Sequence, residues 1–415
     1  MRTSRFDMAV IGDSLAARMA AALLAKHGKR LLLLSSPCCH DPWLHTSLFL
    51  EKLLATLGGR SCFAAFQPFQ VISASARVTI QPELPLTSEL EREFGASATP
   101  AVEFLNRLEQ FGRSLEELLW VHGGLPSAGV SAALRWRWLC LRRKFPMVKL
   151  EGALLDRLQD FPEPVAEWLT DLFQGLSLQP VASLAIVDGA LLWASARRTE
   201  GICGHELQQL LKKRLEQFHG IEKHLEALES LEYRGGQWIG TLHDGGRFQA
   251  GQLLLADLGC RIPGNIPPLP QRAASPPGHF MTTPLNGRIS ALLERQVITG
   301  GSAPLRLTVK SVDDAQVAHV SSSNNAVAEQ LHRQLEPVFP FARYALEPLA
   351  KGHAASADGG TPALPSIFRL PYHAGSHTWC ADESRLLPHL GLGGAALLAW
   401  TLARHIDPSV FPRDS

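Results

Sequence analysis

The segment FDMAVIGDSLAARMAAALLAKHGKRLLLLSSP, at positions 6–37, constrains the fold of this chain more than any other stretch. Residues 6–11 form a short apolar run, which favours a buried parallel strand. Residues 14–27 are rich in alanine and leucine, which have high helix propensity, and Gly28 supplies a stop for that helix. A second apolar run covers residues 30–35. A strand, a helix and a strand within about thirty residues form the parallel βαβ unit of α/β folds.

The turn of this unit can be compared with the glycine fingerprint of dinucleotide-binding folds. Gly12 occupies the first glycine position, Ser14 the second and Ala17 the third. The N-terminus of the following helix offers N–H groups and the positive end of the helix dipole, which favour a pyrophosphate. A glycine at the second position lets the phosphate approach the backbone closely. We therefore expect the Ser14 side chain to crowd that approach.

Composition narrows the class of protein. The chain has 415 residues, of which 46% are hydrophobic and 19% charged, so it can bury a substantial core in one large domain or in two to three ordinary ones. The net charge of +1 gives no basic field for nucleic acid, and we expect no nucleic-acid partner. Uninterrupted apolar runs stay shorter than a membrane span, so we expect a cytoplasmic protein.

The cysteines predict neither a disulfide framework nor a metal site. There are seven, they are scattered, and none forms a C-x-x-C pair. The one cluster is Cys38-Cys39-His40, and adjacent cysteines do not easily share one tetrahedral metal ion. We therefore expect reduced thiols and no metal.

The chain ends on a second glycine turn that leads into a helix, GLGGAALLAWTLARHI at 391–406. Together with the first unit and a long interrupted middle, this order resembles the FAD-dependent phytoene desaturase and flavin amine oxidase superfamily, nearest its phytoene desaturase and carotenoid isomerase branch. The resemblance spans most of the chain. Besides the unit around Gly12, it is carried by the segments 51–108, 201–259 and 377–406.

The resemblance implies an α/β fold of the glutathione-reductase type. A Rossmann-like FAD/NAD(P)-binding domain would be built from residues 1–95, 201–264 and 351–415. An inserted α+β substrate domain would consist of a helical part at 96–200 and a second part at 265–350.

The resemblance also implies an FAD site that closes from both ends of the chain. Its N-terminal half would consist of Gly12, Asp13, Ser14, Leu15, Ala16, Ala17, Ser35 and Ser36. Its C-terminal half would consist of Ala381, Asp382, Leu390, Gly391, Gly393 and Gly394. Asp382 matches the family's aspartate near the ribityl phosphate, and the last helix would point its N-terminus at the flavin. Ser35 and Ser36 stand where the family has a glutamate, so the carboxylate that binds the ribose hydroxyls is missing.

Two functions follow from this pattern. The first is an FAD-dependent oxidoreductase that moves hydride from an apolar or amine-like small molecule to the flavin. No side chain is assigned a catalytic role, because in such enzymes the flavin performs the chemistry. The alternative is a degenerate, non-catalytic relative that acts as a binding or partner subunit. The serines at positions 14, 35 and 36 motivate that alternative.

The stretch LRWRWLCLRRKFPMV at 134–148 is open to two interpretations. It combines two tryptophans with five basic residues, namely Trp136, Trp138, Arg135, Arg137, Arg142, Arg143 and Lys144. Basic groups beside aromatic anchors are typical of a helix on a membrane surface, so the stretch is a candidate for peripheral membrane contact or for a protein partner. The other interpretation is a substrate-domain helix with buried tryptophans and extended arginines. The sequence does not give an oligomeric state.

Overall fold

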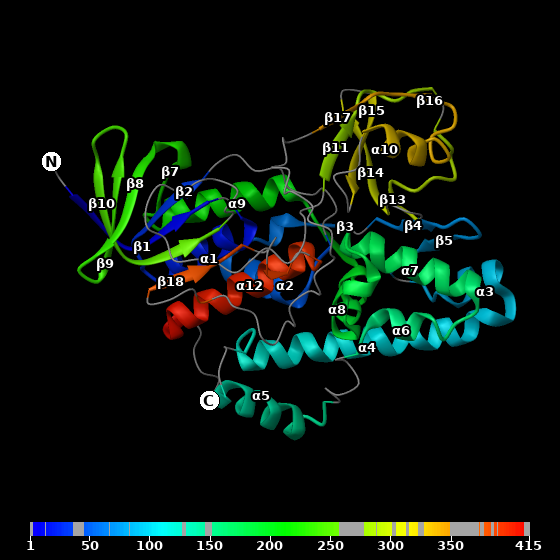
Figure 1. Cartoon of the computed structure of the whole chain (residues 1–415), viewed down its shortest axis with the longest axis horizontal. Coiled ribbons are helices and arrows are strands. Elements are labelled where there is room, and N and C mark those ends of the chain that lie inside the picture. The colour runs from blue at the N-terminus through cyan, green and yellow to red at the C-terminus, as the bar shows by residue number, and fades with distance from the viewer. Residues whose placement is uncertain are drawn as a thin grey trace.

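The structure is a computed structural model that describes residues 3–12, 14–35, 45–65, 67–82, 84–126, 130–145, 152–256, 278–287, 289–300, 304–312, 315–322, 328–348, 373, 377–382, 386–387 and 389–410. Two seven-stranded sheets organise it, and helices cover and connect them (Figure 1). Asp13, Ser36 and the Cys38-Cys39-His40 cluster lie outside the described residues.

The first sheet has a parallel centre drawn from both ends of the chain. Its strands lie in the order β7 (Ile221–His224), β2 (Leu31–Ser35), β1 (Thr3–Ile11), β10 (Arg247–Leu255) and β18 (Thr378–Cys380). Because all five strands run the same way, their carboxyl ends meet at one edge. The residues that follow β1 and β18 in the chain therefore lie there beside Ser35, the last residue of β2.

An antiparallel hairpin extends this sheet. Strands β8 (Leu228–Arg234) and β9 (Gln237–Leu242) pair with each other, and β9 pairs with the first half of β10. The turn between them consists of Gly235 and Gly236, with φ of 61° and 80°, values that glycine adopts without strain.

The two faces of the parallel strands are covered differently. Met8 and Val10 face a core shared with the helices, whereas Ala9 and Ile11 pack in a second cluster with side chains of β8, β9 and β10. This alternation follows from the period of two in a strand. The helices on the first face are α1 (Leu15–Lys26), α2 (Leu48–Leu57), α9 (Gly204–Gln217) and α12 (Gly391–Ile406).

The second sheet belongs to the other half of the molecule. Its order is β17 (Leu346–Pro348), β11 (Gly278–Thr282), β15 (Ala315–Ser322), β14 (Leu305–Val312), β13 (Gln296–Thr299), β4 (Phe69–Ile72) and β5 (Arg77–Ile80). Helix α10 (Ala328–Leu335) packs on one face and α7 (Glu163–Ser177) contacts β13, β4 and β14. Two short pairs complete the strands, β3 (Phe63–Ala65) with β6 (Glu200–Ile202) and β12 (Asn286–Gly287) with β16 (Ala342–Arg343).

The remaining helices form a helical part beside the sheets, in which α5 packs on the outside against α4. They are α3 (Thr87–Phe94), α4 (Ala98–His122), α5 (Val130–Arg142), α6 (Leu154–Leu158) and α8 (Ile186–Ala196), in addition to α7. The α/β class expected from the sequence is confirmed. The division into five segments stays a prediction, although the first sheet does take its strands from the beginning, the middle and the end of the chain.

Helices α4 and α8 cross at a glycine. A Cβ added to Gly112 would lie 2.1 Å from the carbonyl oxygen of Ala190 and 2.7 Å from the Cβ of Ala194. Backbone atoms cannot move aside cheaply, so only glycine permits this approach.

We predict that Gly112→Ala destabilises the fold by about 1–3 kcal/mol, the range expected for overpacking, despite the higher helix propensity of alanine. Urea unfolding followed by circular dichroism measures the change. Gly152→Ala is the control, because a Cβ there meets only an ordinary contact at 3.5 Å. Equal stability of the two variants would contradict the prediction.

Candidate functional site

The turn after β1 has the backbone of a nucleotide-binding loop. Gly12 has φ of +104°, a conformation that glycine favours, and its N–H donates to the carbonyl of Leu34 at 2.9 Å. Leu15, Ala16 and Ala17 then form the first turn of α1 and are buried. The positive end of the α1 dipole therefore lies at the carboxyl edge of the sheet.

Ser14 joins this turn to the far end of the chain. Its side chain accepts a hydrogen bond from the Ala17 N–H at 3.1 Å and donates one to the carbonyl of Ala381 at 2.5 Å. Ser14 is 5% exposed. The hydroxyl thus caps helix α1 and connects the two predicted half-sites, a role that its sequence position did not indicate. The same cap occupies one of the N–H groups that a phosphate could use.

Ala381 and Asp382 follow β18 directly and are almost fully buried. The Ala381 N–H donates to the carbonyl of Leu255 at the end of β10. Since β10 lies between β1 and β18, these residues sit at the same sheet edge as the Gly12 turn. The structure therefore brings Ala381 and Asp382 to the Gly12 turn, whereas Leu390, Gly391 and Gly393 line a cavity at the start of α12.

The N-terminus of helix α12 faces a cavity. Leu390 precedes the helix without a side-chain cap, and Gly391 has φ of +51° with no atom within 4 Å of an added Cβ. A Cβ on Gly393 would meet Ser47 at 3.4 Å, whereas one on Gly394 would meet Leu390 at 2.7 Å. Gly391 and Gly393 thus face the cavity, and Gly394 serves the packing of the helix start.

An acidic side chain stands beside the end of β2, where the sequence predicted that one was missing. The Ser35 hydroxyl donates to the Oε1 atom of Glu222 at 2.8 Å, and Nη1 of Arg18 lies 3.0 Å from the same oxygen. Glu222 comes from the neighbouring strand β7, 187 positions away from Ser35. Only a prediction that β7 pairs with β2 could have indicated Glu222 from the sequence.

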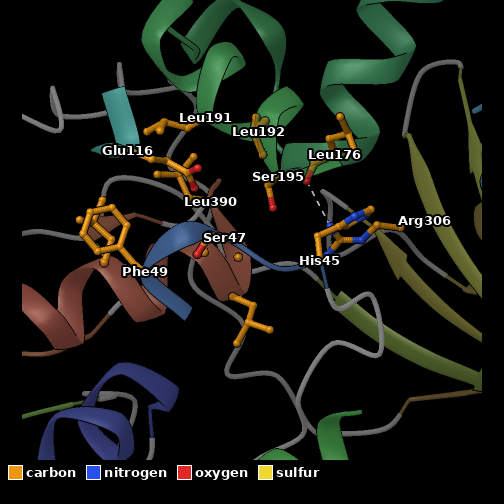
Figure 2. A pocket seen from close by; sticks show the side chains of 14 residues that line it. His45, Ser47, Phe49, Glu116, Leu176, Leu191, Leu192, Ser195, Arg306 and Leu390 are labelled. Carbon is orange, nitrogen blue, oxygen red and sulfur yellow. Dashed lines mark hydrogen bonds between the residues drawn. The ribbon is translucent and has the colours of Figure 1, made fainter. Parts of the chain in front are cut away.

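The cavity lies between α12, α8 and the second sheet (Figure 2). Its volume is about 50 Å³. Its apolar lining consists of Phe49, Leu176, Leu191, Leu192, Leu390, Leu392 and Leu397, and its other lining residues are His45, Ser47, Glu116, Ser195, Arg306, Gly391 and Gly393. Figure 2 shows Arg306 entering from the side of β14, and Ser195 entering from α8.

Two basic side chains line the cavity: Arg306 is buried, and His45 is partly buried with both ring nitrogens shielded from solvent. Arg306 donates from Nη1 to the carbonyl of Leu176 at 3.1 Å, and burial lowers its pKa to about 9, so it stays charged at neutral pH. Burial lowers the pKa of His45 to about 3, so this imidazole is neutral at the same pH. The His45 ring meets Phe69 edge to face at 5.8 Å.

An ion network forms the part of the cavity wall that contains Glu116. Arg198 lies 2.5 Å from Glu116 and 2.5 Å from Glu51, and the Leu48 N–H donates to Glu116 at 3.1 Å. Burial raises the pKa of Glu116, and the charge of Arg198 opposes that shift. A second pair, His389 with Asp188 at 3.0 Å, ties the chain before α12 to α8.

Within the described ranges, no group of histidine, cysteine, aspartate or glutamate side chains is arranged to hold a metal ion. In the same part of the chain, no helix combines the length and apolar character that crossing a bilayer requires.

Comparison with solved structures identifies the fold. Cyclohexylamine oxidase from Brevibacterium oxydans IH-35A superposes with a TM-score of 0.57 at 13% identity, over 97% of this chain and 99% of that one. Wild-type putrescine oxidase bound to putrescine superposes with a TM-score of 0.58 at 13% identity, over 98% and 99%. No protein-family model matches the sequence, and no curated protein does. The chain therefore has the fold of these amine oxidases over nearly its full length, as the resemblance implied.

We predict that Ser14→Ala lowers the free energy of unfolding by about 1–2 kcal/mol, because it removes a helix cap and leaves the buried Ala381 carbonyl without this donor. Chemical unfolding measures the loss. Ser183→Ala is the matched control, because its hydroxyl donates to Pro180 on the exposed surface. A loss at position 14 no larger than the loss at position 183 would refute the assigned role.

We predict that His45 makes the fold sensitive to acid. The unfolded chain takes up a proton near the ordinary pKa of about 6.5, whereas the folded chain does so only near 3. Stability is therefore lost as the pH falls through that interval. His45→Asn should reduce the slope of unfolding free energy against pH by up to about 1.4 kcal/mol per pH unit.

Urea titrations from neutral pH to about pH 5 test this effect of His45. The exposed His205, changed to asparagine, is the control. The prediction fails if His45→Asn and His205→Asn show the same pH dependence.

Proposed function

We propose that the chain is an FAD-dependent oxidoreductase of the amine oxidase type that acts on a small, mainly apolar molecule. The observation that carries this proposal is the Ser14–Ala381 hydrogen bond, which joins the Gly12 turn to the segment that follows β18 at the carboxyl edge of one parallel sheet. In open α/β sheets that edge is where nucleotide ligands bind.

The residues present fit FAD at three points. The Gly12 turn and the start of α1 would face the pyrophosphate. The Glu222 carboxylate beside Ser35 would accept hydrogen bonds from the ribose hydroxyls, in place of the glutamate that the strand end lacks. The N-terminus of α12 at Gly391 would face the flavin ring.

When bound, FAD would supply the hydride acceptor. The protein's own part is to bind, orient and keep the site dry. The leucines of α7 and α8 exclude water from the cavity, while Arg306 and the start of α12 make its polar end positive. His45 is neutral there and can hold a proton on one ring nitrogen and accept on the other.

A second function, that of a non-catalytic binding subunit, is favoured by two observations. Ser14 already occupies the Ala17 N–H. The cavity of about 50 Å³ is also far smaller than the roughly 300–1,000 Å³ of ordinary ligand pockets.

The two functions are separated by the absorption spectrum of the purified full-length chain, before and after incubation with FAD. An oxidoreductase shows flavin absorption that bleaches under anaerobic addition of a substrate, with cyclohexylamine and putrescine as the first probes. A chain that takes up no FAD under these conditions supports the binding subunit and overturns the oxidoreductase.

We predict that Glu222→Gln weakens FAD binding about tenfold or more, because a hydrogen bond to a charged acceptor contributes about 1.5–3 kcal/mol. Isothermal titration with FAD measures the dissociation constant. Glu229→Gln is the control, because Glu229 is exposed on strand β8, at the opposite end of the same sheet from β7. Unchanged affinity of Glu222→Gln would remove Glu222 from the site.

A further inference from the structure

Helix α5 lies on the outside of the molecule, beyond α4 and away from both sheets (Figure 1). One of its faces is anchored. Trp136 and Cys140 are each 4% exposed, and the Trp136 ring meets His122 of α4 edge to face at 5.2 Å. The buried-tryptophan interpretation of the sequence therefore holds for Trp136.

The opposite face carries an exposed apolar stripe. Leu134 and Trp138 are each 60% exposed, and Leu141 is 78% exposed. The spacing of four and three residues places them within about 60° of one another on a helix that turns 100° per residue. We call these three residues the α5 stripe. Three large apolar side chains in one row are more than the single exposed residues normal for a protein surface.

Cations flank the α5 stripe on both sides. Arg137 lies on one side, and Arg135 and Arg142 lie on the other. All three are exposed, as are Arg143 and Lys144 just after the helix. The Arg142 guanidinium lies 5.4 Å from the centre of the Trp138 ring.

The charge of this region is of one sign. The sequence from position 118 to position 150 contains no aspartate or glutamate, although the whole chain has a net charge of only +1. The positive field is therefore local to α5 and its flanks. An occupant of this face must combine negative charge with an apolar layer beneath it.

An anionic lipid surface has both properties. A short helix lying in the headgroup region buries its apolar side chains to a shallow depth, and its arginines reach the lipid phosphates. A nucleic acid would use the cations and leave the stripe in water. A stable protein interface needs about 800 Å² from each partner, which is far more than three side chains supply.

We propose that α5 docks this chain on the surface of an anionic membrane, with Leu134, Trp138 and Leu141 inserted among the headgroups. The docking is independent of whether the chain binds FAD, since α5 shares no residue with the site at α12.

Vesicle co-sedimentation of the purified full-length chain tests this docking. Vesicles of phosphatidylcholine alone are compared with equimolar phosphatidylcholine and phosphatidylglycerol. We expect at least tenfold stronger binding to the anionic vesicles and a marked loss of binding at high salt. Equal binding to both vesicle types, or to neither, overturns the proposal.

Variants then assign the binding to α5. Leu134→Ser with Trp138→Ser and Leu141→Ser should weaken binding to anionic vesicles at least tenfold, and so should Arg137→Gln with Arg142→Gln. All these side chains are exposed, so the fold should be retained. Leu292→Ser with Phe341→Ser is the control, because those side chains are 73% and 76% exposed on the other half of the molecule.

Three results would contradict the role of α5. The first is unchanged vesicle binding by the stripe variant or by the arginine variant. The second is a dimer of the wild-type chain in light scattering that becomes a monomer when the stripe is changed, which assigns the face to a second copy. The third is a duplex DNA that binds more tightly than the anionic vesicles at the same salt concentration.

Discussion

The hydrogen bond from Ser14 to the Ala381 carbonyl joins residues 367 positions apart, and the proposed site depends on it. The same hydroxyl accepts from the Ala17 N–H, so it fixes the start of α1 against the segment that follows β18. Both partners are buried, and a buried hydrogen bond is stronger in that low-dielectric setting and costly to leave unmade. The pairing of β10 with β1 and β18 provides the frame. Within that frame, the Ser14 hydroxyl links the turn after β1 to the segment after β18 at the carboxyl edge of the sheet.

The ion pairs of Arg198 and the contact between His389 and Asp188 hold the second half of the molecule to the first. Arg198 bridges Glu51 of α2 and Glu116 of α4, and Asp188 of α8 lies against His389 before α12. Removing a charge from water is expensive, so the Arg198 network persists only because geometry pairs its charges closely. Each pair connects an element of the first layer with a helix of the other half. The cavity between them therefore has walls from both halves, and its shape depends on their docking.

Helix α5, the proposed docking element, is built on a different principle from the site. Helix α5 has apolar side chains on two faces, and α4 can cover only one of them. Trp136 is buried against His122, while Trp138, two residues later, is left in solvent beside Arg142. The arginines keep the outer face soluble in water and attract anionic phosphates. The proposed site and the proposed docking surface thus occupy separate parts of the chain, and each can be altered without the other.

The sequence by itself determined the local elements at both ends of the chain. Apolar runs and helix propensity predicted β1, α1 and β2, and the glycines at 391–394 predicted the start of α12, because these signals depend on neighbours within a few residues. Only the tertiary structure placed Glu222 beside Ser35, since strand order, and not spacing, makes β7 the neighbour of β2. Only the tertiary structure turned Ser14 toward Ala381 and left Trp138 outside. Such contacts are decided by how distant elements pack, which periodicity along the chain does not encode.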